Sequence, residues 1–321
     1  MGVQDRRFGY HKMTEFLNSF PQSAKAPIWL TIGNFDGLHL GHQALIQKLC
    51  TKAAETNARA VAITFYPHPR VFFGTEKLPY NLMTRNEKNS MFAQLGLDMV
   101  VTLPFTQSLA SMAAEDFLSE LISHFSLQGI VMGPDFSLGK DREGTIPAIQ
   151  AFMRRFGIQV LRESPVLLEG QVVSSESIRT VLGNGRPELA AAMLGRPYSM
   201  SGKVQTGKKL GRRIGLPTAN LLIEPEKFVP KYGVYASKTW LDGKSYASVS
   251  SIGVRPTVEE NATPNVETLI LDFDHDIYDK EIKVDFIQFI RPEIRFENIG
   301  DLIQRIEQDK EEARSILKHG S

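Results

Sequence analysis

The first half of the chain alternates short β-branched runs with longer stretches of helical spacing, and this alternation constrains the fold more than any other feature. The short runs have the composition of buried strands and cover Trp29–Ile32, Val61–Phe65, Met99–Leu103, Ile130–Met132 and Ile158–Leu161. The stretches between them are predicted helices and cover Gly41–Thr56, Arg85–Leu95, Ala113–Phe125 and Thr145–Phe156. Alternation at this spacing predicts a doubly wound parallel sheet with helices on both faces, which binds ligands at the carboxyl ends of its strands.

The second half changes character from about residue 200, where glycine and proline become frequent and apolar residues alternate as in strands. Residues 233–253 predict a hairpin that turns at Asp242-Gly243, and residues 266–290 predict a second hairpin. Several short strands with turns between them predict a small antiparallel β-barrel. Residues Ile299–Leu317 are predicted to form a C-terminal helix.

The length of 321 residues is typical of about two domains, since a domain has roughly 150 residues. Residues 183–200 have the pattern of a short helix between two turns, and we place the domain boundary there. The predicted domains are therefore residues 1–185, with the parallel sheet, and residues 186–321, with the barrel.

Composition limits the compartment and the partners. Lys+Arg 37 against Asp+Glu 36 leave a net charge of +1, so no global field attracts nucleic acid or an anionic membrane. The single cysteine, Cys50, excludes an intramolecular disulfide and a cysteine-rich zinc site and is typical of a reducing cytoplasm. No apolar run approaches the roughly 20 residues that span a bilayer. We expect a cytoplasmic protein with neither membrane nor nucleic acid as partner, and with its oligomeric state open.

A glycine- and histidine-rich segment, GNFDGLHLGH (33–42), follows the first predicted strand and precedes a predicted helix. Glycines let a backbone approach a phosphate closely, and a helix N-terminus supplies unpaired N–H groups to an anion. His39 and His42 could donate to phosphate oxygens or ligate a metal, although no third ligand lies nearby in the sequence. The alternative is a purely structural turn, which the strand–glycine–histidine–helix context disfavours.

The H-x-G-H pair resembles the motif of the nucleotidylyltransferase superfamily. Four further segments occur in order: TFYPHP (64–69), GPDFSLGKDREG (133–144), SSESIR (174–179) and GRRIGLPTANL (211–221). Together they resemble the bacterial bifunctional riboflavin kinases/FMN adenylyltransferases over roughly residues 28–318. This resemblance implies a nucleotidylyltransferase-like sheet domain followed by a β-barrel riboflavin kinase domain.

The resemblance implies that the N-terminal domain joins FMN to the AMP part of ATP and releases pyrophosphate. It assigns catalytic contact with the nucleotide phosphates to His39 and His42. The residues that it implies for ATP binding are Gly33, Phe35, Asp36, Gly37, Ser175 and Arg179. The residues that it implies for flavin binding are His68, Pro69, Asp135, Phe136 and Arg142.

Two residues depart from the family pattern. Leu138 stands where the family usually has phenylalanine, and Glu176 stands where it usually has Thr or Ser. A carboxylate about 5 Å from one phosphate charge, at an effective dielectric near 20, repels it by roughly 3 kcal/mol. Magnesium could offset this repulsion, or Glu176 could point away while Ser175 and Ser177 contact the phosphates. The alternative is a chain in which only the riboflavin kinase works.

For the C-terminal domain, the resemblance implies phosphorylation of riboflavin to FMN with ATP and Mg²⁺. Glu267 matches the catalytic glutamate, a plausible general base for the ribityl 5′-hydroxyl. Thr218 and Asn220 match the P-T-A-N motif, and both offer hard oxygen donors for Mg²⁺ beside the phosphates. The alternative for Thr218 and Asn220 is a structural one, in which they only form a turn. The residues implied for ATP binding here are Gly202, Lys208, Gly215, Thr218 and Asn220.

The basic stretch 203–213 leaves three interpretations open. It fits a glycine-rich flap over ATP, a solvated loop, or the nucleic-acid contact of a flavin-sensing regulatory module. A Walker A loop is excluded because Lys209 replaces the Ser or Thr and because glycines and a proline interrupt the required helix. Asp272, Asp274 and Asp276 mimic the start of an EF-hand, but Ile277 replaces the turn glycine, so a hairpin tip is expected.

Overall fold

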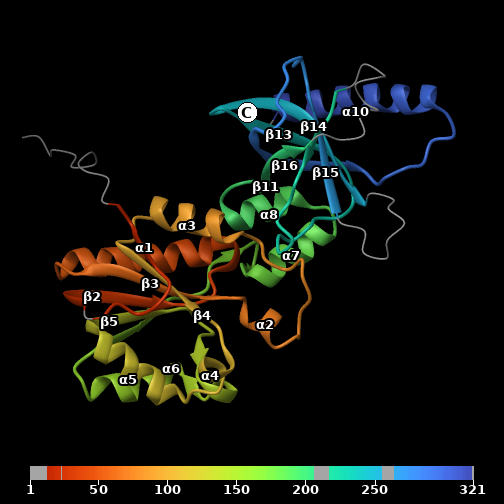
Figure 1. Ribbon diagram of the computed structural model, residues 1–321. Coiled ribbons are helices and arrows are strands. Elements are labelled where there is room, and N and C mark those ends of the chain that lie inside the picture. Colours follow the sequence, from red (N-terminus) through yellow and green to blue (C-terminus); the bar gives the residue numbers. More distant parts are fainter. Residues whose placement is uncertain (1–12, 23, 206–216, 255–263, 320–321) are drawn as a thin grey trace, which may run out of the picture. The chain divides into compact units, whose positions relative to one another are not determined.

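The computed structural model describes residues 13–22, 24–205, 217–254 and 264–319 (Figure 1). Its contacts divide the chain into two compact units. Unit 1 comprises Met1–Glu76 and Arg85–Val166, and unit 2 comprises Lys77–Thr84 and Leu167–Ser321. The short segment 77–84 thus belongs to the second unit although it lies within the sequence of the first.

Unit 1 is built on a six-stranded parallel sheet in the order β1-β4-β3-β2-β5-β8. The strands are β1 (Glu15–Leu17), β2 (Ala24–Ile32), β3 (Arg59–Tyr66), β4 (Met99–Pro104), β5 (Phe125–Met132) and β8 (Gln159–Arg162). All five predicted strands are confirmed. The predicted runs of β2, β3, β4 and β5 are almost entirely buried between the layers, whereas β8, at the edge of the sheet, is only partly buried. The edge strand β1 was not predicted, since its three residues, two exposed and one half-buried, are too few to show a period.

Helices cover both faces of this sheet, which confirms the doubly wound prediction. Figure 1 shows α1 (Leu40–Glu55) and α3 (Arg85–Gln94) on one face, with α5 (Ala114–His124) and α6 (Ile146–Arg154) on the other. Leu30, Val61, Val101 and Ile130 are fully buried between these layers. The shorter elements are η1 (Asp36–Leu38), α2 (Pro69–Phe72), α4 (Gln107–Ala110), β6 (Ser137–Leu138), η2 (Lys140–Arg142) and β7 (Gly144–Thr145).

Unit 2 contains a closed antiparallel barrel in the order β11-β12-β15-β14-β13-β16. Its strands are β11 (Tyr198–Gln205), β12 (Ala219–Leu221), β13 (Gly233–Leu241), β14 (Lys244–Val254), β15 (Pro264–Ile270) and β16 (Glu281–Arg291). The first predicted hairpin is confirmed as β13–β14. Its turn residues, Asp242 and Gly243, have φ of 49° and 78°, the positive values that a two-residue hairpin turn requires.

The second predicted hairpin is wrong. β15 pairs with β12 and β14, whereas β16 pairs with β11 and β13, so the two consecutive strands lie apart in the barrel. Alternation along a strand predicts which residues face the core but not which strand lies beside it. The aspartates between these strands are therefore not a hairpin tip, and Asp272 accepts two hydrogen bonds from Arg314 at 2.7 and 2.8 Å.

Among its described residues, unit 2 also contains the small hairpin of β9 (Leu167–Leu168) and β10 (Gln171–Val172) and three helices. These are α7 (Ser175–Gly183), α8 (Pro187–Leu194) and α10 (Ile299–His319), of which α8 and α10 were predicted. Ala313 and Leu317 of α10 are buried against Val234 and Ala236 of the barrel. Among the helices of the described residues, none combines the length and the apolar character needed to cross a membrane.

Candidate active sites

The predicted nucleotide loop joins β2 to α1 in a tightly held conformation. Phe35 and Leu38 have positive φ of 51° and 41°, values that are costly for side chains of this size. The Phe35 ring is 2% exposed and packs edge-on against Phe92 of α3, with 5.5 Å between the ring centroids. A Cβ at Gly33 would lie 3.1 Å from the same ring, so this position favours glycine. The buried Phe35 ring therefore anchors the loop and leaves little room for a side chain at position 33.

His39 and His42 meet at the N-terminus of α1. His39 is the N-cap residue, and its Nδ1 accepts a hydrogen bond from the His42 N–H at 3.4 Å. The two imidazole rings are stacked with 3.7 Å between their centroids. The first N–H groups of a helix and the positive end of its dipole attract anions. The structure thus brings both predicted catalytic histidines to a position suited to phosphate.

Lys88 of α3 adds a positive charge that sequence reasoning missed. Its Nζ donates to the backbone oxygen of Asn34 at 3.0 Å, within the nucleotide loop. Burial lowers the pKa of His42 well below its ordinary value of 6.5, and the charges of His39 and Lys88 lower it further. His42 is therefore neutral at pH 7, and an added phosphate would favour its protonated form. No motif marks Lys88, which is 54 residues from Asn34 in the sequence.

His68 and Pro69 begin the short helix α2 after β3. Pro69 is the first residue of that helix, and the Nδ1 atom of His68 accepts a hydrogen bond from the N–H of Arg70 at 3.2 Å.

An aromatic cluster that the sequence did not predict lies close to this helix. Phe105, just after β4, lies at its centre. The centroid of its ring is 5.2–5.7 Å from the ring centroids of Phe65, Phe72 and Phe73. Planar aromatic faces of this kind suit a flat ligand.

The loop after β5 holds the other residues predicted on the flavin side. Asp135 is exposed, whereas Phe136 is half-buried and packs against the core of unit 1. Leu138, the departure from the family pattern, packs against the same core, so its bulk serves packing in unit 1. Arg142 donates from Nε to the Ser137 hydroxyl at 2.8 Å, which restrains an otherwise exposed side chain.

The SSESIR segment forms the N-terminus of α7, in unit 2. Ser174 and Ser177 form a capping box: Ser174 Oγ accepts the Ser177 N–H at 3.1 Å, and Ser177 Oγ accepts the Ser174 N–H at 3.0 Å. Ser177 also donates its hydroxyl to the Ser174 backbone oxygen at 2.9 Å. The serine at 177 is thus engaged in starting the helix, a role that the sequence analysis did not assign. Ser175 is the first residue of the helix.

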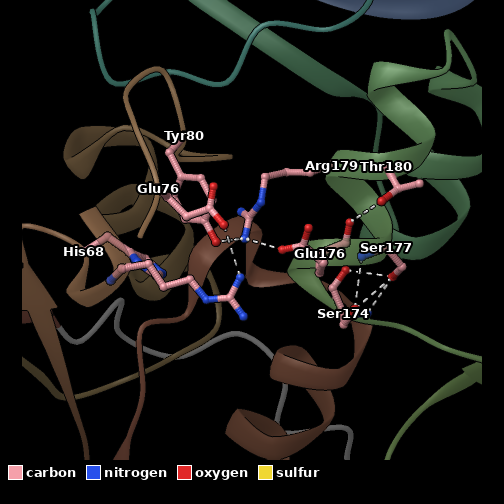
Figure 2. A network of polar contacts seen from close by, with 9 residues as sticks. His68, Glu76, Tyr80, Ser174, Glu176, Ser177, Arg179 and Thr180 are labelled. Atoms are coloured by element: carbon pink, nitrogen blue, oxygen red, sulfur yellow. Dashed lines mark hydrogen bonds and ion pairs between the residues drawn. The ribbon is translucent and has the colours of Figure 1, made fainter. Parts of the chain in front are cut away.

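Arg179 lies between Tyr80 and Glu176 (Figure 2). Its Nη2 donates to the Tyr80 hydroxyl at 2.6 Å, and its guanidinium carbon is 3.8 Å from the centre of the Tyr80 ring. Glu176 Oε2 lies 3.6 Å from the same Nη2, with 61% of the glutamate side chain exposed. The carboxylate that departs from the family pattern therefore faces water and a guanidinium. Tyr80, in the 77–84 segment, was missed because 99 residues separate it from Arg179.

In the barrel, Asn220 on β12 lies directly opposite Glu267 on β15. A third residue, Asn265, connects them: its Nδ2 donates to Asn220 Oδ1 at 3.3 Å and to Glu267 Oε1 at 2.9 Å. Asn220 is buried, and the other two side chains are half-buried. Thr218 is half-buried immediately before β12. The structure thus gathers the predicted general base and a predicted magnesium ligand, and Asn265 is an addition.

Gly202 on β11 packs closely against backbone, since a Cβ there would lie 2.1 Å from the Leu222 oxygen. Lys208 and Gly215, and with them nearly all of the predicted ATP flap, lie outside the described residues. Among the side chains that the structure does describe, no group of three or more His, Cys, Asp or Glu could hold a metal ion.

Comparison with known proteins finds two family models that match successive parts of the chain. The FAD synthetase family model matches residues 21–177, and the riboflavin kinase family model matches residues 194–317. A bifunctional riboflavin kinase/FMN adenylyltransferase of Haemophilus influenzae is 36% identical over 290 residues, covering 90% of this chain and 94% of the relative. The chain belongs to the bifunctional riboflavin kinase/FMN adenylyltransferase family. A member from Pseudomonas fluorescens is 37% identical, covering 89% and 92% of the two chains.

A solved structure resembles the whole chain as well. The crystal structure titled as a macrolide-efflux protein from Streptococcus pneumoniae superposes with a TM-score of 0.85. It is 26% identical and covers 94% of this chain and 98% of its own. Membership of the riboflavin kinase/FMN adenylyltransferase family confirms the resemblance found in the sequence motifs. The roles of individual residues remain predictions.

Proposed function

We propose that this chain converts riboflavin to FMN and then FMN to FAD, with ATP as the second substrate of both reactions. The observation that carries this proposal is the presence, on one chain, of a histidine pair at a helix N-terminus and an Asn–Asn–Glu cluster in a closed barrel. Each lies within the part of the chain matched by the corresponding family model. The assignment of the two reactions to residues 1–185 and 186–321 is part of the proposal.

In the adenylyltransferase reaction, a phosphate oxygen of FMN attacks the α-phosphorus of ATP, and pyrophosphate leaves. Such a displacement needs positive charge and hydrogen-bond donors around the phosphates more than it needs a nucleophilic side chain. His39, His42 and the N-terminus of α1 supply donors, and Lys88 adds charge to the loop. Phe35, Gly33, Asp36 and Gly37 shape the backbone that approaches ATP, and Ser175 and Arg179 remain ATP ligands predicted from the motif.

The flavin of this reaction would lie against the end of β3 and the loop after β5. His68, Pro69, Asp135, Phe136 and Arg142 are the proposed contacts. The Phe65–Phe72–Phe73–Phe105 cluster adds aromatic faces, of which Phe73 is 58% exposed and free to stack on a flat ring. Arg142 adds a cation for the FMN phosphate.

In the kinase reaction, the 5′-hydroxyl of riboflavin attacks the γ-phosphorus of ATP, and ADP leaves. Glu267 is the proposed base that takes the hydroxyl proton, because its half-buried carboxylate lies beside the predicted nucleotide motif. Thr218, Asn220, Gly202, Lys208 and Gly215 are the proposed ATP contacts.

The residues present fit Mg²⁺ as a partner of the nucleotide. Thr218 and Asn220 offer neutral oxygen donors of the kind that Mg²⁺ prefers. Mg²⁺ keeps several waters and is usually held by one or two protein groups together with substrate phosphates, so a larger ligand cluster is not required. When bound, the ion would neutralise charge on the phosphates of ATP.

The kinase-only alternative rested on repulsion between Glu176 and phosphate. A carboxylate that is 61% exposed is screened by water, and a guanidinium 3.6 Å away opposes its charge. The repulsion of roughly 3 kcal/mol applies to a charge at an effective dielectric near 20, and solvent exposure reduces it. Both activities therefore remain the proposal, with cytoplasmic location as a further prediction.

The test is chromatography of flavins after incubation of purified protein with MgATP and either riboflavin or FMN. We expect riboflavin to yield FMN and then FAD, and supplied FMN to yield FAD. Conversion that stops at FMN, with supplied FMN unchanged, would favour the kinase-only alternative. Absence of turnover, together with salt-sensitive binding to nucleic acid, would favour the regulatory module instead.

A further inference from the structure

The cluster in the barrel holds a residue that neither the motifs nor the general-base assignment includes. Asn265 lies two positions before Glu267 on β15, so both side chains project from the same face of the strand. Asn220 faces the same cluster from β12, directly opposite Glu267. One amide group is therefore placed between the predicted base and the predicted magnesium ligand.

The hydrogen-bond chemistry of this bridge is directional. An asparagine NH₂ group carries two donor hydrogens, and the Nδ2 of Asn265 directs them to Asn220 Oδ1 at 3.3 Å and Glu267 Oε1 at 2.9 Å. The bond to the carboxylate restrains a flexible glutamate side chain in one orientation. The bond to Asn220 selects the orientation of that amide in which its oxygen, and not its NH₂, faces the cluster.

We propose that Asn265 is a positioning residue of the riboflavin kinase site, which orients the Glu267 carboxylate and the Asn220 amide oxygen together. The proposal rests on the proposed kinase function of the barrel. Asn265 acts through its two neighbours, and its contribution is geometric. A base or ligand displaced by about 1 Å can cost a hundredfold in rate, so losing the bridge should lower turnover more than substrate binding.

The test compares Asn265→Ala with a matched control, Asn298→Ala, in the full chain. Asn298 lies in the same unit and makes two hydrogen bonds to Asp301 at the start of α10, at 2.8 and 2.9 Å. We expect Asn265→Ala to lower kcat for FMN formation about 10-fold to 100-fold, with the KM for riboflavin changed less than about threefold. Asn298→Ala should lower the melting temperature and leave FMN formation unchanged.

A second readout does not depend on turnover. ADP is the nucleotide product of the kinase reaction. The substitution lies in the barrel, so a difference in ADP binding between wild type and Asn265→Ala reports on the kinase site. Calorimetry of ADP binding with and without Mg²⁺ should show a weaker magnesium-dependent gain in affinity for Asn265→Ala than for wild type. FAD formation from supplied FMN should be unaffected, since Asn265 belongs to the barrel.

A double-mutant cycle tests whether Asn265 acts through the glutamate. In a Glu267→Gln background, Asn265→Ala should lower kcat for FMN formation by a much smaller factor than it does in wild type, because the effects of coupled residues are not additive. An equal cost in both backgrounds would overturn the proposal. A kcat of Asn265→Ala within twofold of wild type would also overturn it. The same holds if both Asn265→Ala and Asn298→Ala lose FMN formation in proportion to their loss of melting temperature. If wild-type protein forms no FMN, the kinase proposal fails, and a magnesium-dependent ADP response unchanged by Asn265→Ala would separately overturn the role of Asn265.

Discussion

At the scale of single residues, Glu176 and Arg179 show how a motif departure is accommodated. Glu176 lies in the first turn of α7, where a negative charge interacts favourably with the helix dipole. Its carboxylate also faces Arg179, the arginine that the family motif assigns to ATP. Glu176 therefore suits the start of the helix while it pairs with the arginine that the motif predicts to bind phosphate.

We expect Glu176→Thr to raise the rate of FAD formation from supplied FMN, because it removes the negative charge beside Arg179. The gain should be largest at low ionic strength, where an exposed charge is screened least. Steady-state rates at two salt concentrations measure this effect, with Glu188→Thr as a control at an exposed glutamate of the neighbouring helix α8. An unchanged rate for Glu176→Thr would indicate that the carboxylate does not oppose ATP binding.

His42 leads to a prediction about pH and stability. Because burial lowers its pKa below 6.5 in the folded protein, the unfolded chain binds a proton below pH 6.5 that the folded chain does not. The stability that neutral His42 contributes is thus present above pH 6.5 and is lost as the pH falls toward the lowered pKa. Melting temperatures from pH 8 to 5 should fall less steeply for His42→Asn than for wild type. Parallel curves would contradict this account.

At the scale of elements, α10 is joined to the barrel by a buried ion cluster. The Asp309 side chain is 2% exposed. Its carboxylate forms an ion pair with Arg291 of β16 at 2.7 Å and another with Arg305 of its own helix at 3.0 Å. Apolar contacts through Ala313 and Leu317 complete the interface. Removing one member of such a cluster leaves buried charge uncompensated.

We expect Asp309→Ala to destabilise unit 2 by about 3–5 kcal/mol, because two guanidinium groups lose their common acceptor. Urea unfolding followed by fluorescence measures the change. The comparison is Arg314→Ala, which breaks the exposed pair with Asp272 and should change stability little. Equal effects of the two substitutions would show that burial does not determine the strength of these ion pairs.

At the scale of the whole molecule, the predicted catalytic residues belong to different compact units: His39 and His42 to unit 1, and Glu267 to unit 2. Ser175 and Arg179, the ATP ligands predicted for the first reaction, also lie in unit 2. We expect Glu267→Ala to abolish FMN formation and to spare FAD formation from supplied FMN. Chromatography with each flavin as sole substrate tests this separation. Loss of both activities to the same extent would contradict the assignment of one reaction to each part of the chain.

The extent of unit 2 bears on where the chain can be divided. Lys227 is 3% exposed, and its Nζ donates to the Leu82 backbone oxygen at 3.0 Å, within the 77–84 segment that belongs to this unit. A fragment of residues 186–321 would lose that hydrogen bond together with the rest of the segment, which includes the buried Tyr80, Leu82 and Met83. We therefore expect the fragment to melt several degrees below the same unit in the full chain. Equal melting temperatures of the fragment and of this unit in the full chain would contradict this expectation.

The sequence by itself determined both fold classes and the family. Periods of two and 3.6 residues are local properties, and each predicted strand of unit 1 and the Asp242-Gly243 hairpin follow from residues close together in the chain. The motifs around His39, Asn220 and Glu267 are equally local. Their individual roles stay predictions.

Only the tertiary structure decided which elements and side chains meet. It separated β15 from β16, which the sequence had predicted as a hairpin, because barrel closure and not chain order sets the neighbours of a strand. It placed Asn265 beside Asn220, 45 residues away, and Tyr80 on Arg179, 99 residues away. No periodicity encodes such pairs, since they depend on where two backbones pass each other once the core has formed.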